Sequence, residues 1–347
     1  MRANPLGLDG IDFVTFASPE PAALASLFRA LGFSRTMRHA FRDLELWQQG
    51  GIRFVLDRDP ASFSAGFARA HGPSIPSMGW CVADARQALA EAERRGAVRA
   101  RSADLVGPGG EPVPAIEGVG GSLLYLCEHN EDPRRFERLG FLPLERPERR
   151  ADKGFFAIDH LTNNVERGTL ARWAAFYKDV FGFTEVRYFD IRGVKTGLQS
   201  FALRSPCGTF CIPINEAREE ASQIAEYLRE YRGPGVQHLA LRSNDLLGSL
   251  ALLEGSGIET LDIEDDYYDE AFARVPGLLE DRAEIRRRKV LVDGDQEGYL
   301  LQIFTKNVVG PIFVELIQRR NHASFGEGNF GALFRSIERD QARRGAL

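Results

Sequence analysis

Residues 11–16 read Ile-Asp-Phe-Val-Thr-Phe, and residues 158–163 read Ile-Asp-His-Leu-Thr-Asn. Each stretch is followed by a helical pattern that ends in a Gly-Phe pair, at residues 32–33 in the first case and 182–183 in the second. Glycine directly after the last turn is typical of a helix C-terminus. Both copies therefore predict a strand, a helix and a glycine turn, and this internal repeat guides the interpretation of the whole chain.

Three strand-like segments follow each Gly-Phe pair, so the repeated unit is βαβββ. A more diverged copy of the unit follows in each half, which makes four units. One such unit cannot close a curved sheet around a core, so we expect α+β architecture with units paired into two open-barrel domains. The predicted domains are residues 1–145 and 155–347, joined by a charged, proline-containing stretch. An amphipathic pattern from residue 329 to about residue 344 predicts a C-terminal helix.

The composition points to small-molecule partners. The chain has 347 residues, of which 44% are hydrophobic, enough for about two domains. Its 44 Lys and Arg against 49 Asp and Glu give a net charge of −5, so we expect neither nucleic-acid nor membrane binding. Four cysteines are too few for a disulfide framework, and no apolar stretch resembles a signal peptide or a membrane span. We therefore expect a cytoplasmic protein.

Two of the six histidines occupy equivalent positions of paired units. His160 lies in the first strand of the third unit, and His238 lies in the first strand of the fourth. Glu315 interrupts an otherwise apolar strand, where a buried carboxylate is costly unless a cation compensates it. Two imidazoles and one carboxylate are the ligand set of non-haem Fe(II) oxygenases. The repeat therefore predicts a metal site in the second half.

The first half lacks this ligand set in the same alignment. The matching residues are Phe13, Trp80 and Leu126, so hydrophobic side chains are expected to fill the first barrel and the N-terminal domain is predicted to be metal-free. The remaining histidines fall in loop-like or polar contexts and are expected to be solvated: His39, His71, His129 and His322.

The second half resembles 4-hydroxyphenylpyruvate dioxygenase, a family with the vicinal oxygen chelate fold. The resemblance covers about residues 158–341 and rests on several strings in the same order, among them IDHLTNNVERG, GVQHLAL, GPIFVELIQR and FGEGNFGALFRSIERDQ. It implies that His160, His238 and Glu315 bind Fe(II), as the repeat suggests independently. Asn163 departs from the family pattern, in which a second histidine often follows the first.

The resemblance also implies a substrate pocket. Its residues would be Ser200, Pro213, Asn215, Gln223, Gln237, Gln302, Phe304, Phe313, Phe325 and Phe330. Among these, Gln302, Asn215 and Phe330 are expected to take part in catalysis. Aromatic faces suit a flat ring, and amides can donate to and accept from a neutral phenol. The terminal helix is expected to cover the cavity and exclude water.

The implied reaction is the oxidative decarboxylation and ring hydroxylation of 4-hydroxyphenylpyruvate by O2, with side-chain migration, to give homogentisate and CO2 in tyrosine catabolism. Hydroxymandelate synthase uses the same substrate and metal but replaces the residues that match Pro213, Asn215 and Phe330, so these three favour the dioxygenase. A homo-oligomer, dimer or tetramer, is expected.

Two further classes of protein are compatible with the sequence. A protein of the same fold could bind an aromatic ligand without turnover, although retention of three ligand-type residues argues against that. An extradiol catechol dioxygenase would need a general-base histidine near the metal, and the strands expected in the second half supply none.

Overall fold

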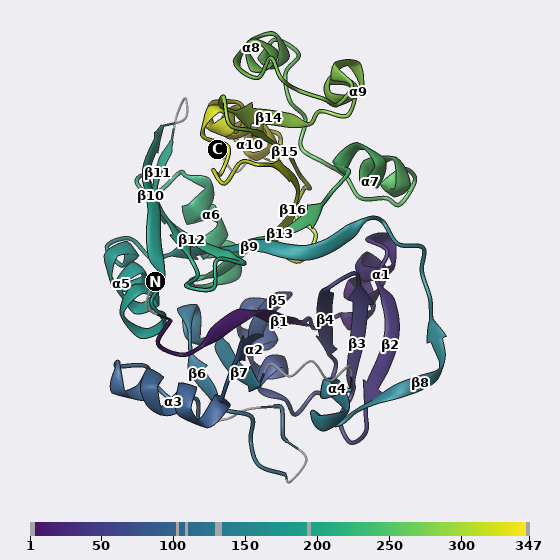
Figure 1. Cartoon of the computed structure of the whole chain (residues 1–347), viewed down its shortest axis with the longest axis vertical. Helices are drawn as coiled ribbons and strands as arrows, with labels where there is room; N and C mark the ends of the chain where they lie inside the picture. The colour runs from purple at the N-terminus through teal and green to yellow at the C-terminus, as the bar shows by residue number, and fades with distance from the viewer. Residues whose placement is uncertain (1–3, 102–103, 108–109, 129–133, 193–195, 345–347) are drawn as a thin grey trace.

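The computed structural model describes residues 4–101, 104–107, 110–128, 134–192 and 196–344. Two curved, mixed β-sheets, one from each half of the chain, organise these residues (Figure 1). In spatial order, the first sheet contains β6 (Ala115–Glu117), β7 (Leu123–Glu128), β5 (Ser74–Val82), β1 (Leu8–Ala17), β4 (Ile52–Asp57), β3 (Leu44–Gln49), β2 (Ser34–His39) and β8 (Phe141–Glu148).

The second sheet repeats this plan. In spatial order, it contains β10 (Thr184–Arg192), β11 (Gly197–Arg204), β12 (Cys211–Ala217), β9 (Phe155–Val165), β13 (Gly235–Ser243), β16 (Phe313–Arg320), β15 (Tyr299–Phe304) and β14 (Leu291–Gly294). β9 pairs parallel with β12 and antiparallel with β13, as β1 does with β4 and β5. The first strands of paired units therefore lie side by side in the middle of each sheet.

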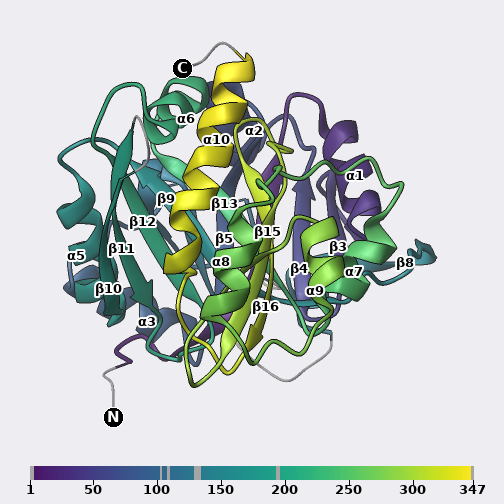
Figure 2. The same ribbon diagram turned by 90° about the horizontal axis from the view of Figure 1, so that it is seen from above.

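The helices lie outside the two sheets or over their open sides. They are α1 (Pro21–Ala30), α2 (Phe63–His71), α3 (Ala85–Arg94), α4 (Arg135–Arg138), α5 (Leu170–Phe181), α6 (Gln223–Tyr231), α7 (Leu246–Leu253), α8 (Tyr267–Arg274), α9 (Arg282–Arg287) and α10 (Phe330–Arg344), with short 3-10 turns η1 (Val119–Gly121) and η2 (Glu327–Asn329). Figure 2 shows α10, in yellow, lying across the strands of the second sheet. Among the helices in the described ranges, none has the length and apolar character needed to cross a membrane.

The predicted α+β fold with paired βαβββ units and a C-terminal helix is confirmed. The first, third and fourth units follow the pattern, while the second departs from it: β8, the strand that follows β7, pairs with β2 of the first unit. The first sheet thus continues to Glu148, beyond residue 145. The division into domains at 1–145 and 155–347 stays a prediction.

Helix caps mark equivalent positions in the first strands of the second and fourth units, β5 and β13. Asp84 accepts a hydrogen bond from the backbone of Gln87 at the start of α3, and Asp245 accepts one from Gly248 at the start of α7. Ser77 and His238 each lie seven residues before their cap. Pairing agrees with this count, because Thr162 pairs with His238 and the matching Thr15 pairs with Ser77.

Two of the three expected first-half matches are therefore wrong. Ser77, not Trp80, stands at the place of His238. Tyr125, not Leu126, stands at the place of Glu315, because it pairs with the strand position that matches Ala240, the partner of Glu315. Phe13 keeps its expected place. The sequence alignment misplaced β5 and β7 because they share little side-chain similarity with β13 and β16, the matching strands of the second half.

The two halves share one apolar core. The fully buried ring of Trp80 lies 4.8 Å from that of Phe181 and 5.4 Å from that of Phe210, measured between centroids. Both partners belong to the second half of the chain, so the outer face of the first sheet packs on the third unit. The largest cluster of buried hydrophobic residues accordingly extends through both sheets.

Candidate metal centre

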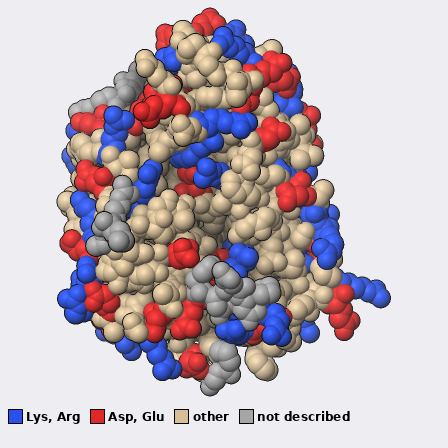
Figure 3. Space-filling model, in the orientation of Figure 1, with Lys and Arg blue, Asp and Glu red and all other residues tan. Residues whose placement is uncertain are grey.

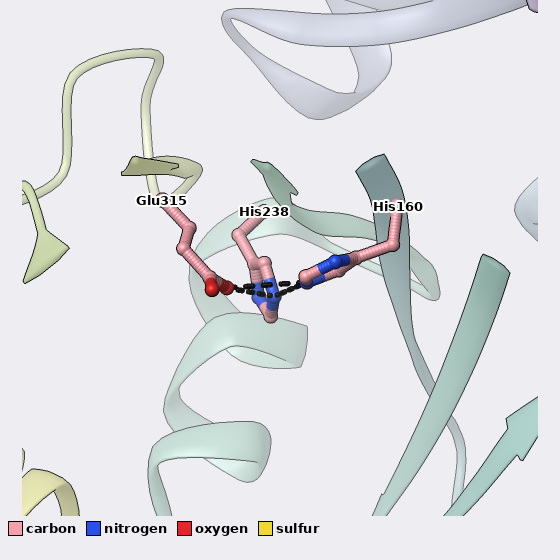
Figure 4. A group of neighbouring side chains, drawn as sticks. All are labelled: His160, His238 and Glu315. Atoms are coloured by element: carbon pink, nitrogen blue, oxygen red, sulfur yellow. Dashed lines mark hydrogen bonds and ion pairs between the residues drawn. The ribbon is translucent and has the colours of Figure 1, made fainter. Parts of the chain in front are cut away.

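Three neighbouring strands bring His160, His238 and Glu315 together (Figure 4). His160 Nε2 lies 3.1 Å from Glu315 Oε2 and 3.3 Å from His238 Nε2, and the latter nitrogen lies 3.6 Å from the same carboxylate oxygen. All three residues have little exposed surface, and their candidate ligand atoms lie within 4.8 Å of one another. Among the described residues, these three form the one cluster of His, Cys, Asp or Glu side chains that could hold a metal ion.

Asp159 and Arg319 orient His160 from the side of the ring that faces away from the metal position. Its Nδ1 donates to Asp159 Oδ2 at 2.9 Å, and Arg319 contacts both oxygens of that carboxylate at 2.8 and 2.7 Å. Burial opposes protonation of His160, but Glu315 and Asp159 outweigh it and raise the His160 pKa to about 9. The negative charge that favours a proton on Nε2 would equally favour a divalent cation there.

His238 is held by different contacts. Its Nδ1 donates to Gln237 Oε1 at 3.0 Å, its Nε2 lies 2.9 Å from the hydroxyl of Thr162, and its ring stacks on Phe313 with centroids 4.8 Å apart. Burial, and then the nearby His160, lower the His238 pKa well below its ordinary value. A neutral imidazole with Nε2 facing inward is the form that binds metals.

The donor set fits a metal ion. Two imidazole nitrogens and a carboxylate oxygen converge, and each ring has its other nitrogen bonded to an oxygen, as in metal-ligating histidines generally. The three side chains project from one face of the sheet. The space on the far side of their donor atoms opens into the cavity. This arrangement is typical of sites that bind a substrate beside the metal.

A cavity with about 680 Å³ of empty space adjoins these three residues. Every residue of the predicted pocket lines it: Ser200, Pro213, Asn215, Gln223, Gln237, Gln302, Phe304, Phe313, Phe325 and Phe330. Part of this space is open to solvent. The roles of these residues stay a prediction.

The amides of the cavity are linked. Asn215 Nδ2 donates to Gln237 Oε1 at 3.4 Å, and Gln237 Nε2 donates to Gln223 Oε1 at 3.5 Å. Because Gln237 Oε1 also accepts from His238, the orientation of that amide is fixed by the candidate ligand. Gln302 is 1% exposed on β15, and Ser200 is buried on β11.

Sequence reasoning missed eight residues of the cavity. They are Thr162, Phe189, Ile191, Leu198, Ala202, Leu333, Phe334 and Ile337. Thr162 lies two residues after His160 in the same strand, so strand alternation was a signal that could have found it. The last three follow the helical spacing of α10, whose apolar side therefore forms a wall of the cavity.

Two polar contacts, one to β10 and one to α8, hold the segment before α10 in place. Glu327 of η2 pairs with Arg187 of β10 at 2.6 Å, and Asn329 Oδ1 accepts a hydrogen bond from Tyr267 at 2.6 Å. Gly326 has a φ of 78° and lies against Gln302, whose Nε2 would be 2.6 Å from a Cβ at that position. The start of α10 is thus in direct contact with the cavity wall.

The other singled-out polar residues lie elsewhere. Asn163 points away from the ligands and donates to the hydroxyl of Tyr177 at 3.4 Å, so its departure from the family pattern affects packing against α5. The expectation of a solvated His39 is wrong, since it is 3% exposed at the end of β2. His71 Nδ1 lies 2.8 Å from the carbonyl of Tyr231. His129 lies outside the described residues.

Paired βαβββ units with two histidines and a glutamate on neighbouring strands define a metal-site protein of the vicinal oxygen chelate class. Comparisons with known families agree. Residues 2–144 match the family model described as the N-terminal part of hydroxyphenylpyruvate dioxygenase. Residues 157–302 match that of the glyoxalase, bleomycin resistance protein and dioxygenase superfamily.

Relatives of known name extend over the whole length. Protein MelA of Shewanella colwelliana is 53% identical, with 99% of each chain covered. The 4-hydroxyphenylpyruvate dioxygenase of Pseudomonas aeruginosa is 43% identical over 99% of this chain and 97% of the relative. A solved triple mutant of 4-hydroxymandelate synthase from Streptomyces coelicolor superimposes with a TM-score of 0.81 at 25% identity, over 96% and 99% of the two chains. The chain belongs to the 4-hydroxyphenylpyruvate dioxygenase family.

Proposed function

We propose that this protein is an Fe(II)-dependent dioxygenase that converts 4-hydroxyphenylpyruvate and O2 to homogentisate and CO2. The observation that carries the proposal is the convergence of His160, His238 and Glu315 within 4.8 Å at the wall of an aromatic cavity. Bound there, Fe(II) would activate O2 and would be chelated by the 2-oxo acid group of the substrate. His160, His238 and Glu315 are the proposed ligands.

The side chains around the metal position would bind and orient the substrate. Phe304, Phe313 and Phe330 offer ring faces and edges to the aromatic ring, each contact contributing about 0.5–1.5 kcal/mol beyond burial. The linked amides of Asn215, Gln223 and Gln237 can hold a neutral phenol or a carboxylate oxygen through hydrogen bonds. Helix α10 would exclude water from the reacting centre, which prevents loss of reactive species.

The second candidate is hydroxymandelate synthesis, in which the benzylic carbon is hydroxylated instead of the ring. The similarity to 4-hydroxymandelate synthase supports this second candidate. Pro213, Asn215 and Phe330 favour the dioxygenase, because by the family resemblance the synthase has other residues there. The ring of Phe330 stands edge-on to that of Phe189, with centroids 5.2 Å apart, and so restricts one side of the cavity.

Oxygen uptake and product identification test the proposal. The Fe(II)-loaded protein with 4-hydroxyphenylpyruvate is expected to consume O2 and to form homogentisate. The two possible products are isomers of equal mass, so they are separated by chromatography against standards. Formation of 4-hydroxymandelate would support the synthase instead, and no O2 uptake would support a non-catalytic binding protein. Assembly as a dimer or tetramer and a cytoplasmic location stay predictions.

A further inference from the structure

A second cavity lies at the other end of the catalytic barrel. It has about 760 Å³ of empty space, part of it open to solvent, and shares no lining residue with the cavity beside the metal position. Its lining residues come from β9, β11, β12, β13, β16 and the turns beside them. We name it the rear cavity; its argument rests on Asp159, Arg204, Thr209, Arg242, Arg319 and Asn321.

Strand alternation explains why arginines gather there. Arg204, Arg242 and Arg319 each lie four residues after a residue that lines the substrate cavity, namely Ser200, His238 and Glu315. The pairing registers of these stretches contain no bulge against β12 or between β13 and β16, so each arginine lies on the same sheet face as its inward-facing predecessor. Three guanidinium groups therefore approach one opening of the barrel.

One of the three is fully occupied. Arg319 contacts both oxygens of Asp159 and also donates to the carbonyls of His322 and Ser324, at 3.2 and 2.5 Å. Asp159 is the carboxylate among the residues that line the rear cavity, and Arg319 and His160 already engage it. Among the described residues that line this cavity, no acidic side chain is left to neutralise the other two arginines.

Arg204 and Arg242 are half-buried, and no ion pair joins either to a carboxylate among the residues the structure describes. The guanidinium of Arg242 lies over the ring of Phe156, 5.7 Å from its centroid, which holds it in place. The protein as a whole is acidic, and Figure 3 shows basic and acidic side chains interspersed over the face in view. An acid-poor cavity with two such arginines is therefore a local exception.

We propose that the rear cavity binds a small molecule through a phosphate or carboxylate group, held by Arg204 and Arg242. Guanidinium groups bind these oxyanions by paired, charge-assisted hydrogen bonds. The hydroxyl of Thr209 and the amide of Asn321 at the rim are further hydrogen-bonding groups. This site is separate from the proposed metal centre, so a ligand here would not compete with 4-hydroxyphenylpyruvate.

Thermal unfolding of the metal-loaded full-length protein at constant ionic strength tests the site, with inorganic phosphate, acetate and chloride as the added anions. Phosphate or acetate should raise Tm with saturation, while chloride should not. Tighter binding of phosphate would assign the site to phosphate esters, and tighter binding of acetate would assign it to carboxylates. Absence of a saturable rise with either anion would overturn the proposal.

Variants locate the binding. The double variant Arg204→Gln and Arg242→Gln should raise the Kd of the bound anion at least tenfold, since each charge-assisted contact is worth about a factor of ten. Arg242→Lys, which keeps the charge but loses the paired geometry, should fall between the double variant and the unmodified protein. If the double variant did not fold, this single variant would still decide, because an unchanged Kd in it or in the double variant contradicts the site.

Two control variants distinguish the rear cavity from a general surface-charge effect and from the metal centre. Arg172 is exposed and also lies over an aromatic ring, so Arg172→Gln tests the effect of losing one surface charge and should leave the Kd unchanged. Glu315→Gln, which removes a proposed metal ligand, should keep the anion effect. Loss of the effect in either control would place the anion elsewhere and overturn the assignment to Arg204 and Arg242.

Discussion

His160 depends on a charge pair behind it. Asp159 and Arg319 are both nearly buried, and removing either partner of such a pair leaves an uncompensated charge that costs about 3–5 kcal/mol. Burial opposes ionisation of Asp159, but Arg319 and His160 outweigh it and keep the Asp159 pKa below its ordinary value. The ionised carboxylate fixes Nδ1 as the donor, and Nε2 is thereby directed to the metal position.

Replacing one candidate ligand should abolish metal retention. Glu315→Gln removes the carboxylate charge at the centre while keeping the side-chain size, so iron affinity should fall by more than about 100-fold and turnover should be lost. Iron content after Fe(II) loading and desalting measures the effect. Glu259→Gln, at an exposed carboxylate paired with Lys306, is the matched control and should retain iron. Stoichiometric iron in Glu315→Gln would contradict the site.

Asp57 in the first sheet gives a pH-dependent prediction. Burial, and then the neighbouring Asp104, raise the Asp57 pKa from 3.8 to about 6. The folded state therefore binds this proton more strongly than the unfolded state, so Asp57 lowers the free energy of unfolding progressively from about pH 4 to pH 6 and fully above that.

Asp57→Asn should consequently stabilise the protein by about 1–3 kcal/mol at pH 8 and by less at pH 5. Urea unfolding at the two pH values measures the difference. Asp43→Asn, at an exposed carboxylate near the same strands, is the control for losing one negative charge and should change the free energy of unfolding by less than about 0.5 kcal/mol. An equal effect of Asp57→Asn at both pH values would show that its carboxyl titrates normally.

Single residues differed in how far the sequence could predict them. The repeat singled out His160 and His238 because both lie in first strands, where position carries over from unit to unit. Arg319 could not be found this way, because its partner Asp159 lies 160 residues away and neither has a local pattern that indicates the other.

At the scale of secondary-structure elements, α10 forms one wall of the cavity and η2 leads into this helix. Leu333, Phe334 and Ile337 form one side of α10 and line the cavity, while the start of the helix is fixed by Arg187 and Tyr267. The helical spacing predicted α10 within one residue of its start. Its contacts with β10 and α8 depend on tertiary packing, which the spacing does not contain.

Gly326→Ala tests the joint before α10. A side chain at a φ of 78° costs about 1–2 kcal/mol, and the added Cβ would displace the amide of Gln302. We expect lower stability and a loss of at least about tenfold in kcat/KM, equivalent to about 1.4 kcal/mol. Urea unfolding and steady-state kinetics measure the two effects.

The matched control lies in the helix itself. A Cβ at Gly331 would meet only the end of the Arg335 side chain at 3.6 Å. Gly331→Ala should therefore keep activity and raise stability by about 0.5–1 kcal/mol, because alanine favours a helix over glycine. Similar behaviour of the two variants would show that Gly326 is not a constrained position.

At the scale of the whole molecule, we expect the packing between the two halves to contribute to stability. Trp80→Ala would empty a fully buried ring site between the first sheet and α5, with an expected cost of about 3–5 kcal/mol in the free energy of unfolding. Urea unfolding measures this cost. Trp173→Ala, at a half-buried tryptophan on α5 itself, is the control and should cost less. A smaller loss for Trp80→Ala than for this control would show that the halves are coupled elsewhere.

The sequence predicted two paired-unit sheets but not how they pack on each other. The sequence alignment predicts that Trp80 lies inside the first barrel, at the place of a ligand. In the structure it faces the opposite side of β5 and contacts the third unit, where no repeat relationship indicates a partner. Ser77 was recoverable from the sequence, since the caps Asp84 and Asp245 mark equivalent positions.

All three candidate ligand strands are interior strands of the second sheet, bonded to neighbours on both edges. Their amide protons should be among the slowest to exchange with deuterated solvent, because exposing them requires breaking two ladders at once. A chelator that removes the ion would then act on side chains whose backbone stays in place. The metal should therefore come off and return many times without the chain having to refold.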